Sequence, residues 1–156
     1  MNNSSKKSLL KQLNNIRGLT IVSFNIKDKI EEAISNTGER FYLKDGKIIL
    51  FETEGRLVPS LHGILKNIFS LPQVVVDMGA VRYVARGADI MAPGIRKVDT
   101  DLDVDDLVVI VDETHGKPLA IGYLIMKPNE ILEVHKGKAI KSLHYVSDKI
   151  WNYTTM

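Results

Sequence analysis

Two segments of the sequence combine basic, aromatic and glycine residues in a pattern that could bind nucleic acid. They are "VRYVARGADIMAPGIRK" (residues 81–97) and "HKGKAIKSLHY" (residues 135–145). Lys and Arg side chains pair with phosphates, glycine loops let bases approach backbone amides, and aromatic rings stack on unpaired bases. We predict that several of their cationic side chains converge on one face next to the glycine loop. Residue types alone leave open that the lysines only solvate the exterior. The cationic candidates are Arg82, Arg86, Arg96, Lys97, Lys136 and Lys138.

The stretch "ARGADIMAPGI", residues 85–95, is unusual in the middle of a small chain. Pro93 is incompatible with a buried strand, and Pro93 with Gly94 is incompatible with the interior of a regular helix. Ile90 and Met91 are not typical of a plain surface loop. The stretch therefore predicts a short, partly buried turn whose backbone passes close to another group.

Other chemistry-bearing residues form no known site. Counted from Asp99, the acidic run Asp99–Asp106 lacks the glycine and the final carboxylate of a calcium loop, so it predicts a solvated loop. The four histidines have no metal-binding spacing, and His144 could serve as a structural hydrogen-bonding group or contact a ligand. Common nucleophile, zinc and phosphate-loop motifs are missing. The sequence predicts no catalytic residue, metal or cofactor.

The composition is that of a globular protein, with 44% hydrophobic and 26% charged residues. The sequence lacks cysteine, which fits a reducing compartment. It also lacks an apolar run of roughly 20 residues and a secretory leader, so we expect a cytoplasmic protein that does not enter membranes. The net charge is +2, with 11 Lys/Arg against 7 Asp/Glu in residues 1–73 and 10 against 12 in residues 74–156.

Periodicity predicts the elements of the first half. Asp45-Gly46 indicates a type I′ turn between two strands, and a third short strand follows Gly55. Ser4 or Ser5 is the expected cap of the first helix. The other expected elements are a helix over 5–16, a strand over 19–26, a helix over 27–35 and a helix over 59–69.

After Pro72 the pattern changes to short apolar runs about ten residues apart, each closed by Gly, Pro, Asn or Asp. This spacing is typical of a small barrel or sandwich. The predicted fold class is α+β, with a small α/β domain over residues 1–72 and a mixed β-barrel over residues 73–156. Because the linker is short, we expect the two domains to pack as one rigid body.

Residues 74–152 closely resemble a PUA domain, the RNA-binding module named after pseudouridine synthases and archaeosine transglycosylases. The matching features are Gly79-Ala80 at the expected first strand, the loop Gly87–Ile95, the strand Leu119–Gly122, the turn "KGKA" and the terminal "HYVSDKIW". Two positions depart from the family, because Asp105-Asp106 and Ser147-Asp148 stand where it has Gly-Asp. Because the turn at Asp105-Asp106 lacks its glycine, we expect it to adopt a different geometry.

The upstream segment "DGKIILFETEGRLVPSLHGILKN" resembles the pre-PUA half of the malignant T-cell amplified sequence family and its archaeal relatives. That resemblance implies RNA binding in translation, at the tRNA acceptor end and the small ribosomal subunit, with a translation-factor protein as a further partner. The alternative is an RNA-docking subunit of a tRNA- or rRNA-modifying enzyme. Without cysteines, the chain does not itself carry a zinc-binding module.

The resemblance also implies how the 85–95 stretch is used. Gly87 would let the chain leave a strand, Ala88–Met91 would form a brief helix, and Pro93-Gly94 would turn the chain back. The ligand is predicted to be a single-stranded RNA end or loop. The predicted contacts are Arg82, Arg86, Gly87, Ala88, Asp89, Met91, Pro93, Gly94, Arg96, Lys97, Lys136, Lys138, His144 and Tyr145.

Overall fold

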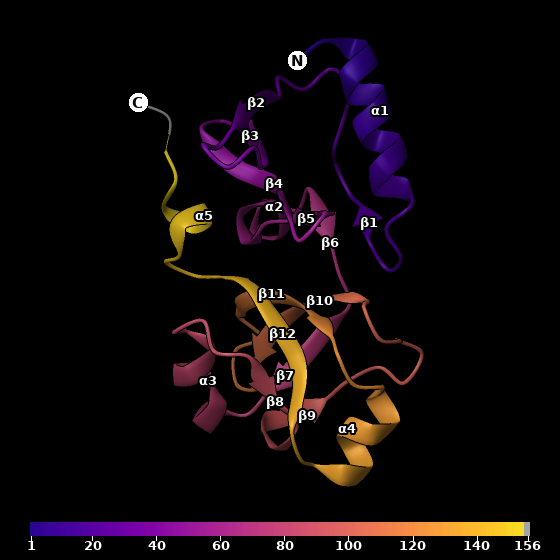
Figure 1. Ribbon diagram of the computed structural model, residues 1–156, viewed down its shortest axis with the longest axis vertical. Helices are drawn as coiled ribbons and strands as arrows, with labels where there is room; N and C mark the ends of the chain where they lie inside the picture. Colours follow the sequence, from indigo (N-terminus) through magenta and orange to yellow (C-terminus); the bar gives the residue numbers. More distant parts are fainter. Residues whose placement is uncertain (155–156) are drawn as a thin grey trace.

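The computed structural model describes residues 1–154 as five α-helices and three β-sheets. Figure 1 shows the two-stranded and four-stranded sheets in the first half of the molecule. The third sheet, which has six strands, lies in the other half with the helices α3 (Met78–Val84) and α4 (Pro128–Val134). The third sheet is mixed and curls into a half-barrel. The α+β prediction is therefore confirmed, whereas the division at residue 72 stays a prediction.

Helix α1 (Asn3–Asn14) forms as predicted, although its cap lies earlier than expected. Asn2 accepts a hydrogen bond from the backbone N–H of Ser5, at 2.8 Å. Leu9 and Leu13 are buried against the first half of the molecule. The predicted strand over 19–26 shrinks to β1 (Thr20–Ile21), because only these residues pair with β6 (Phe69–Ser70).

A four-stranded antiparallel sheet follows, in the order β2-β3-β4-β5. Asp45 and Gly46 have φ of 52° and 78°, as the predicted turn between β3 and β4 requires. The predicted helix over 27–35 is wrong: its second half pairs with β3, and this pairing overrides the helical spacing of its apolar residues. The strands are β2 (Glu31–Ile34), β3 (Arg40–Lys44), β4 (Lys47–Thr53) and β5 (Arg56–Pro59).

Helix α2 (Leu61–Leu65) is shorter than the predicted helix over 59–69. Pro59 ends β5, and the buried Ser60 starts the helix by accepting a hydrogen bond from the N–H of Gly63, at 3.1 Å. The helix ends at Leu65 because Asn67, two residues later, takes a left-handed conformation with φ of 57°.

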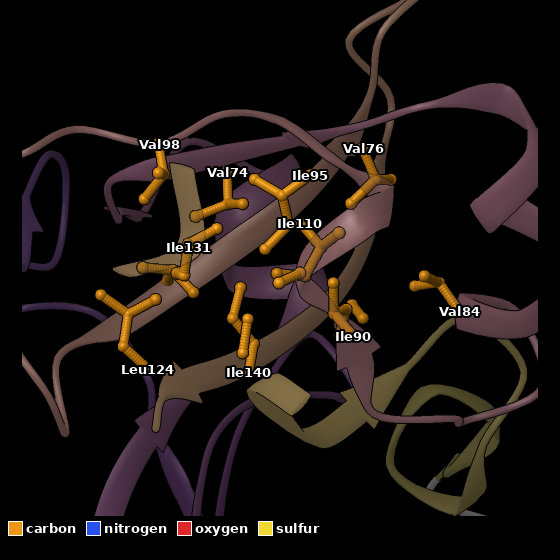
Figure 2. Close-up of a cluster of buried hydrophobic side chains, with 14 of the residues drawn as sticks. Val74, Val76, Val84, Ile90, Ile95, Val98, Ile110, Leu124, Ile131 and Ile140 are labelled. Carbon is orange, nitrogen blue, oxygen red and sulfur yellow. The ribbon is translucent and has the colours of Figure 1, made fainter. Parts of the chain in front are cut away.

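The third sheet has the strand order β8-β12-β11-β10-β7-β9, with only the β7–β10 pair parallel. Figure 2 shows Val74, Ile110 and Ile140 among the side chains that fill its concave side. Its strands are β7 (Gln73–Val76), β8 (Ile90–Met91), β9 (Ile95–Lys97), β10 (Leu107–Asp112), β11 (Pro118–Leu124) and β12 (Lys138–Tyr145). The helices around it are α3 (Met78–Val84), α4 (Pro128–Val134) and α5 (Lys149–Asn152).

Strand β10 is buried on both faces, which explains its unbroken apolar run. Val108 and Ile110 point into the half-barrel, whereas Val109 on the opposite face packs with residues of the first half such as Phe51 and Leu61. The two halves therefore share a continuous hydrophobic cluster across this sheet. Within residues 1–154, no helix is both long and apolar enough to cross a bilayer.

The predictions for residues 78–95 need correction. Gly79-Ala80 does not open a strand but lies in α3, which Asp77 caps by accepting a hydrogen bond from the N–H of Ala80, at 2.8 Å. Ala88–Met91 is not a helix: Ile90 and Met91 form β8, because Ile90 pairs with Ile140 of β12. The single turn of helix comes one step later, as a 3₁₀ turn over Ala92–Gly94.

The two positions where the PUA pattern loses its glycine retain a left-handed backbone. Asp105 has φ of 73° and Ser147 has φ of 77°. The prediction of a different geometry at Asp105-Asp106 is therefore wrong, since Asp105 adopts the φ range that favours glycine, and Ser147 adopts the same range. Each is followed by an aspartate that stabilises the turn. The carboxylate of Asp106 accepts a hydrogen bond from the N–H of Asp103, and that of Asp148 accepts one from the N–H of Tyr145.

Candidate nucleic-acid interface

A cavity of about 700 Å³ lies between α3, the chain from Ala88 to Gly94 and the start of β12. Six of the predicted contact residues line it: Ala88, Asp89, Met91, Pro93, Gly94 and Lys138. The other lining residues are Asp77, Gly79, Ala80, Tyr83, Val84 and Ile90. The walls are mostly small or apolar, with three charged side chains among them.

Small residues bring the 3₁₀ turn onto α3. The backbone N–H of Asp77 donates to the carbonyl of Gly94 at 2.9 Å, and a Cβ on Gly94 would lie 3.0 Å from the Cβ of Ala80. Gly94 does not have a positive φ, so glycine is needed there for close approach and not for backbone freedom. A larger residue would push the turn away from α3.

Gly87 is constrained in two ways. It ends α3 with φ of +88°, and the N–H groups of Gly87 and Ala88 donate to the carbonyls of Val84 and Tyr83, a Schellman ending. A Cβ on Gly87 would also lie 2.5 Å from Cε1 of Tyr145. Gly87 therefore leaves a helix, not a strand, and lets the loop rest on the aromatic ring at the end of β12.

Asp89 fixes the loop to β12. One carboxylate oxygen accepts the backbone N–H of Ser142 at 2.9 Å, and the other lies 3.4 Å from Nζ of Lys138. The Lys138 side chain is 63% exposed, so its ammonium can reach a ligand at the mouth of the cavity. The pairing with Asp89 holds this positive charge at the edge of a mostly apolar cavity.

Sequence reasoning missed Tyr83, which the structure places at the cavity. Its side chain is 51% exposed, and the guanidinium of Arg82 lies 4.9 Å from the centre of its ring. The available signal was an aromatic residue between two arginines in "VRYVARG". The sequence predicts a strand at Tyr83, and the alternating side-chain directions of a strand do not indicate that Tyr83 lies beside the 88–94 loop.

The other predicted cations do not line this cavity. Arg82 and Arg86 are exposed on and after α3, and Lys136 is exposed in the turn before β12. Arg96 is on β9 and pairs with Glu113 at 3.1 Å, while Lys97 lines a different cavity beside Val75. Lys138 is the one predicted cation of the six that lines the cavity, so the convergence of the other five on one face stays a prediction.

Comparison with known proteins identifies the family. Residues 72–146 match the model of the PUA domain. An uncharacterized protein of Methanocaldococcus jannaschii is 43% identical over 127 residues, which cover 81% of this chain and 78% of that protein. Translation machinery-associated protein 20 of Saccharomyces cerevisiae is 34% identical over 155 residues, which cover 96% and 86%. The chain belongs to this family of PUA-domain proteins. Malignant T-cell-amplified sequence proteins are further relatives.

A solved structure supports the same assignment over nearly the whole chain. The crystal structure of a hypothetical protein from the archaeon Pyrococcus horikoshii aligns with a TM-score of 0.77 and 29% identity. The alignment covers 97% of this PUA-domain chain and 95% of that protein. The family resemblance predicted from the sequence is therefore confirmed in both halves.

His144 of the PUA domain is not available as a surface contact. It is fully buried, Nε2 accepts the backbone N–H of Leu61 at 3.1 Å, and Nδ1 bonds the carboxylate of Asp148 at 2.8 Å. Of the two roles considered for His144, the structure supports the structural hydrogen-bonding role. Its neighbour Tyr145 does not line the cavity but lies against Gly87 at the start of the loop.

The acidic run of the PUA domain contacts the first half of the molecule. Arg17 donates to the carbonyl of Asp101 at 2.8 Å, and its Nε lies 3.6 Å from the largely buried carboxylate of Asp106. Arg56 donates to the carbonyl of Asp105, also at 2.8 Å. Within residues 1–154, no group of three His, Asp or Glu side chains is arranged to hold a metal ion.

Proposed function

We propose that this PUA-domain protein binds RNA in the translation machinery and that the cavity beside α3 receives a single-stranded RNA end. The observation that carries the proposal is the shape and chemistry of that cavity. It is a hollow of about 700 Å³ with small and apolar walls, and Tyr83, Met91 and Lys138 line it. A flipped or terminal base fits such a hollow, and a cation at its mouth suits the adjoining phosphate.

Duplex RNA suits this cavity less well than a free end does. An RNA helix presents its phosphates and a wide, shallow minor groove, and its bases stay stacked inside. A free end can separate its bases and place them against apolar walls and an aromatic ring, where stacking contributes about 1–3 kcal/mol per base. We therefore favour the acceptor terminus of a tRNA as the ligand.

The relatives support a role in translation without fixing its details. The yeast relative is named as associated with the translation machinery. We propose the small ribosomal subunit and a translation-factor protein as further partners, and binding without catalysis as the activity. Co-sedimentation with small ribosomal subunits supports this role, whereas a stable complex with an RNA-modifying enzyme instead would favour the docking-subunit alternative.

The direct test compares a tRNA with and without its 3′ terminal nucleotides, for the wild type and Met91→Glu. Met91 is 46% exposed and lines the cavity, so the change places a negative charge there without disturbing the core. It is a cleaner probe than Gly94→Glu, which would collide with Ala80. We expect a loss of about 1–3 kcal/mol in binding the intact tRNA.

Leu65→Glu is the matched control, because Leu65 is 49% exposed on α2 and does not line the cavity. This variant should bind as the wild type does. Equal wild-type affinity for the two tRNAs would exclude recognition of the end. An undiminished affinity of Met91→Glu would exclude the cavity.

A further inference from the structure

The positive charge of the chain is concentrated near its start, far from the cavity. Residues 1–27 contain five Lys or Arg and not one Asp or Glu. The remaining 129 residues carry 16 Lys or Arg against 19 Asp or Glu. In Figure 1, α1 lies along one side of the molecule and α3 lies on the other side, in the opposite half.

The solvent-facing residues of α1 are uniform in chemistry. Every exposed side chain between residues 3 and 15 can donate a hydrogen bond, and none carries negative charge. These residues are Asn3, Ser4, Ser5, Lys7, Ser8, Lys11, Gln12, Asn14 and Asn15. Lys, Ser, Asn and Gln are the residue types that hold phosphate and sugar groups in nucleic-acid complexes.

Lys7 and Lys11 lie one turn apart on the helix, where like charges repel each other. A surface helix that only needs stability commonly places Glu or Asp three or four residues from a lysine. No such position around Lys7 or Lys11 holds a carboxylate. Within residues 1–154, neither ammonium lies within 4.0 Å of a carboxylate oxygen. The pair therefore lowers the stability of the helix slightly.

A third cation is held beside this helix. The buried Lys6 donates from Nζ to the carbonyls of Ile26 and Asp28, which flank the exposed Lys27. The nearest carboxylate in the sequence, Asp28, is itself paired with Lys44 at 3.3 Å. Within residues 1–154, Lys27 forms no ion pair, so it adds to the positive charge near the first turns of α1.

We infer that α1 and its neighbouring loop form a second RNA-binding surface, the α1 surface, composed of Lys7, Lys11, Gln12, Asn15 and Lys27. Its ligand is the phosphate backbone of double-helical RNA. Phe24 is the only aromatic residue among residues 1–27, and it is buried, so this surface offers charge and donors but no stacking platform. The inference rests on the proposal that the protein acts on RNA, and it adds a duplex contact distinct from the single-stranded end.

The experiment measures binding of a blunt RNA duplex of about 20 base pairs, longer than the roughly 16 that double-stranded RNA modules span. The variant is Lys7→Glu/Lys11→Glu. It keeps the like-charge spacing of the helix and replaces Lys by a residue of similar helix propensity, so the fold is retained. The matched control is Lys66→Glu/Lys117→Glu, which changes the net charge equally at two exposed lysines outside the α1 surface.

We expect the α1 variant to bind the duplex about tenfold more weakly at low salt. Its affinity should also fall less steeply with rising salt concentration, by the amount that about two phosphate contacts contribute. The control should keep most of the wild-type affinity. The α1 variant should also keep the ratio between the affinities for tRNA with and without its 3′ nucleotides, which separates this test from that of the cavity. Equal duplex binding by wild type and α1 variant would overturn the inference. So would an equal loss in the control, or binding to anionic lipid vesicles but not to the duplex.

Discussion

The imidazole of His144 accepts a hydrogen bond from the backbone N–H of Leu61 across the junction of the two halves, at 3.1 Å. Because Nε2 accepts this bond, Nδ1 carries the proton and donates it to Asp148. The bond satisfies a backbone donor in the first turn of α2, which is buried and would otherwise lack a partner. His144 thus connects the last strand of the PUA domain to the first half of the molecule.

We expect His144→Leu to lower the free energy of unfolding by about 2–4 kcal/mol, because it leaves the Leu61 N–H unpaired and removes a partner of the Asp148 carboxylate. Urea-induced unfolding followed by circular dichroism measures the change. His115→Leu is the control, because His115 is exposed in the β10–β11 turn. Equal stability of the two variants would show that the bond to Leu61 contributes nothing.

Asp148 should make stability depend on pH in the acid range. Burial raises the pKa of this carboxyl, but hydrogen bonds from His144 and from the backbone N–H groups of Trp151 and Tyr145 outweigh burial and hold the pKa below its ordinary value. A lowered pKa stabilises the fold above the unfolded value of about 3.9, and this contribution disappears as the pH falls through the folded pKa.

The test compares wild type and Asp148→Asn in urea at about pH 6 and about pH 3. The variant should be less stable at the higher pH by about 1–3 kcal/mol, since it loses a charged acceptor of three hydrogen bonds. It should also lose less stability than the wild type on acidification. Parallel pH profiles for the two proteins would contradict a role for this carboxylate.

The sequence predicted well those elements whose signal is local. Asp45-Gly46 takes the backbone angles that its turn type demands, and the repeat of Leu9 and Leu13 marks the buried side of α1. The prediction failed at β2, where helical spacing of Ile30, Ala33 and Ile34 competed with pairing to β3. Ile34 is in fact 62% exposed, so it was never part of a buried face.

The site was predicted in part for a related reason. The loop over residues 87–94 is recognisable from its own glycines and proline, and most of it lines the cavity. The burial of His144 depends on Leu61, 83 positions away, and the contribution of Tyr83 depends on α3 packing beside β8. Contacts of this kind leave no periodic trace in a single sequence.

Restoring glycine at the two left-handed turns should stabilise the protein. Asp105 and Ser147 have φ of 73° and 77° and are exposed, and no hydrogen bond of their own side chains would be lost. Ser147→Gly should raise the free energy of unfolding by about 0.5–1 kcal/mol, because an L-residue is strained in this region. Thermal unfolding of the variant and the wild type measures this difference in stability. Ser142→Gly, inside β12, should destabilise the protein instead.

Lys138 should account for a salt-dependent part of RNA binding that Arg96 does not supply. Both are cations of the PUA domain paired with one carboxylate, but only Lys138 lines the cavity. For a single-stranded RNA end, Lys138→Met should make the salt slope shallower by about 0.7, the value of one phosphate contact. Arg96→Met should leave the slope unchanged. If instead Arg96→Met changed the slope and Lys138→Met did not, the phosphate contact would lie at Arg96 on β9.

Gly87→Ala should be the most damaging small substitution in the loop. Gly87 has φ of +88°, and a Cβ there would lie 2.5 Å from Cε1 and 2.8 Å from Cζ of Tyr145. Gly38 has the same φ of +88°, but a Cβ on Gly38 would have nothing within 4 Å. Gly38→Ala therefore carries only the backbone strain, about 1–2 kcal/mol, and the difference between the two variants isolates the collision with the ring.

The collision should be relieved by removing the ring. We expect Gly87→Ala to cost about 1–3 kcal/mol more than Gly38→Ala, the typical penalty of overpacking, and to weaken binding of a single-stranded RNA end because β8 is displaced. In the background of Tyr145→Ala, the cost of Gly87→Ala should fall to that of Gly38→Ala. A double-mutant cycle of unfolding free energies measures this coupling. Additive effects would show that the loop does not rest on Tyr145, and the cavity would then need another support for its shape.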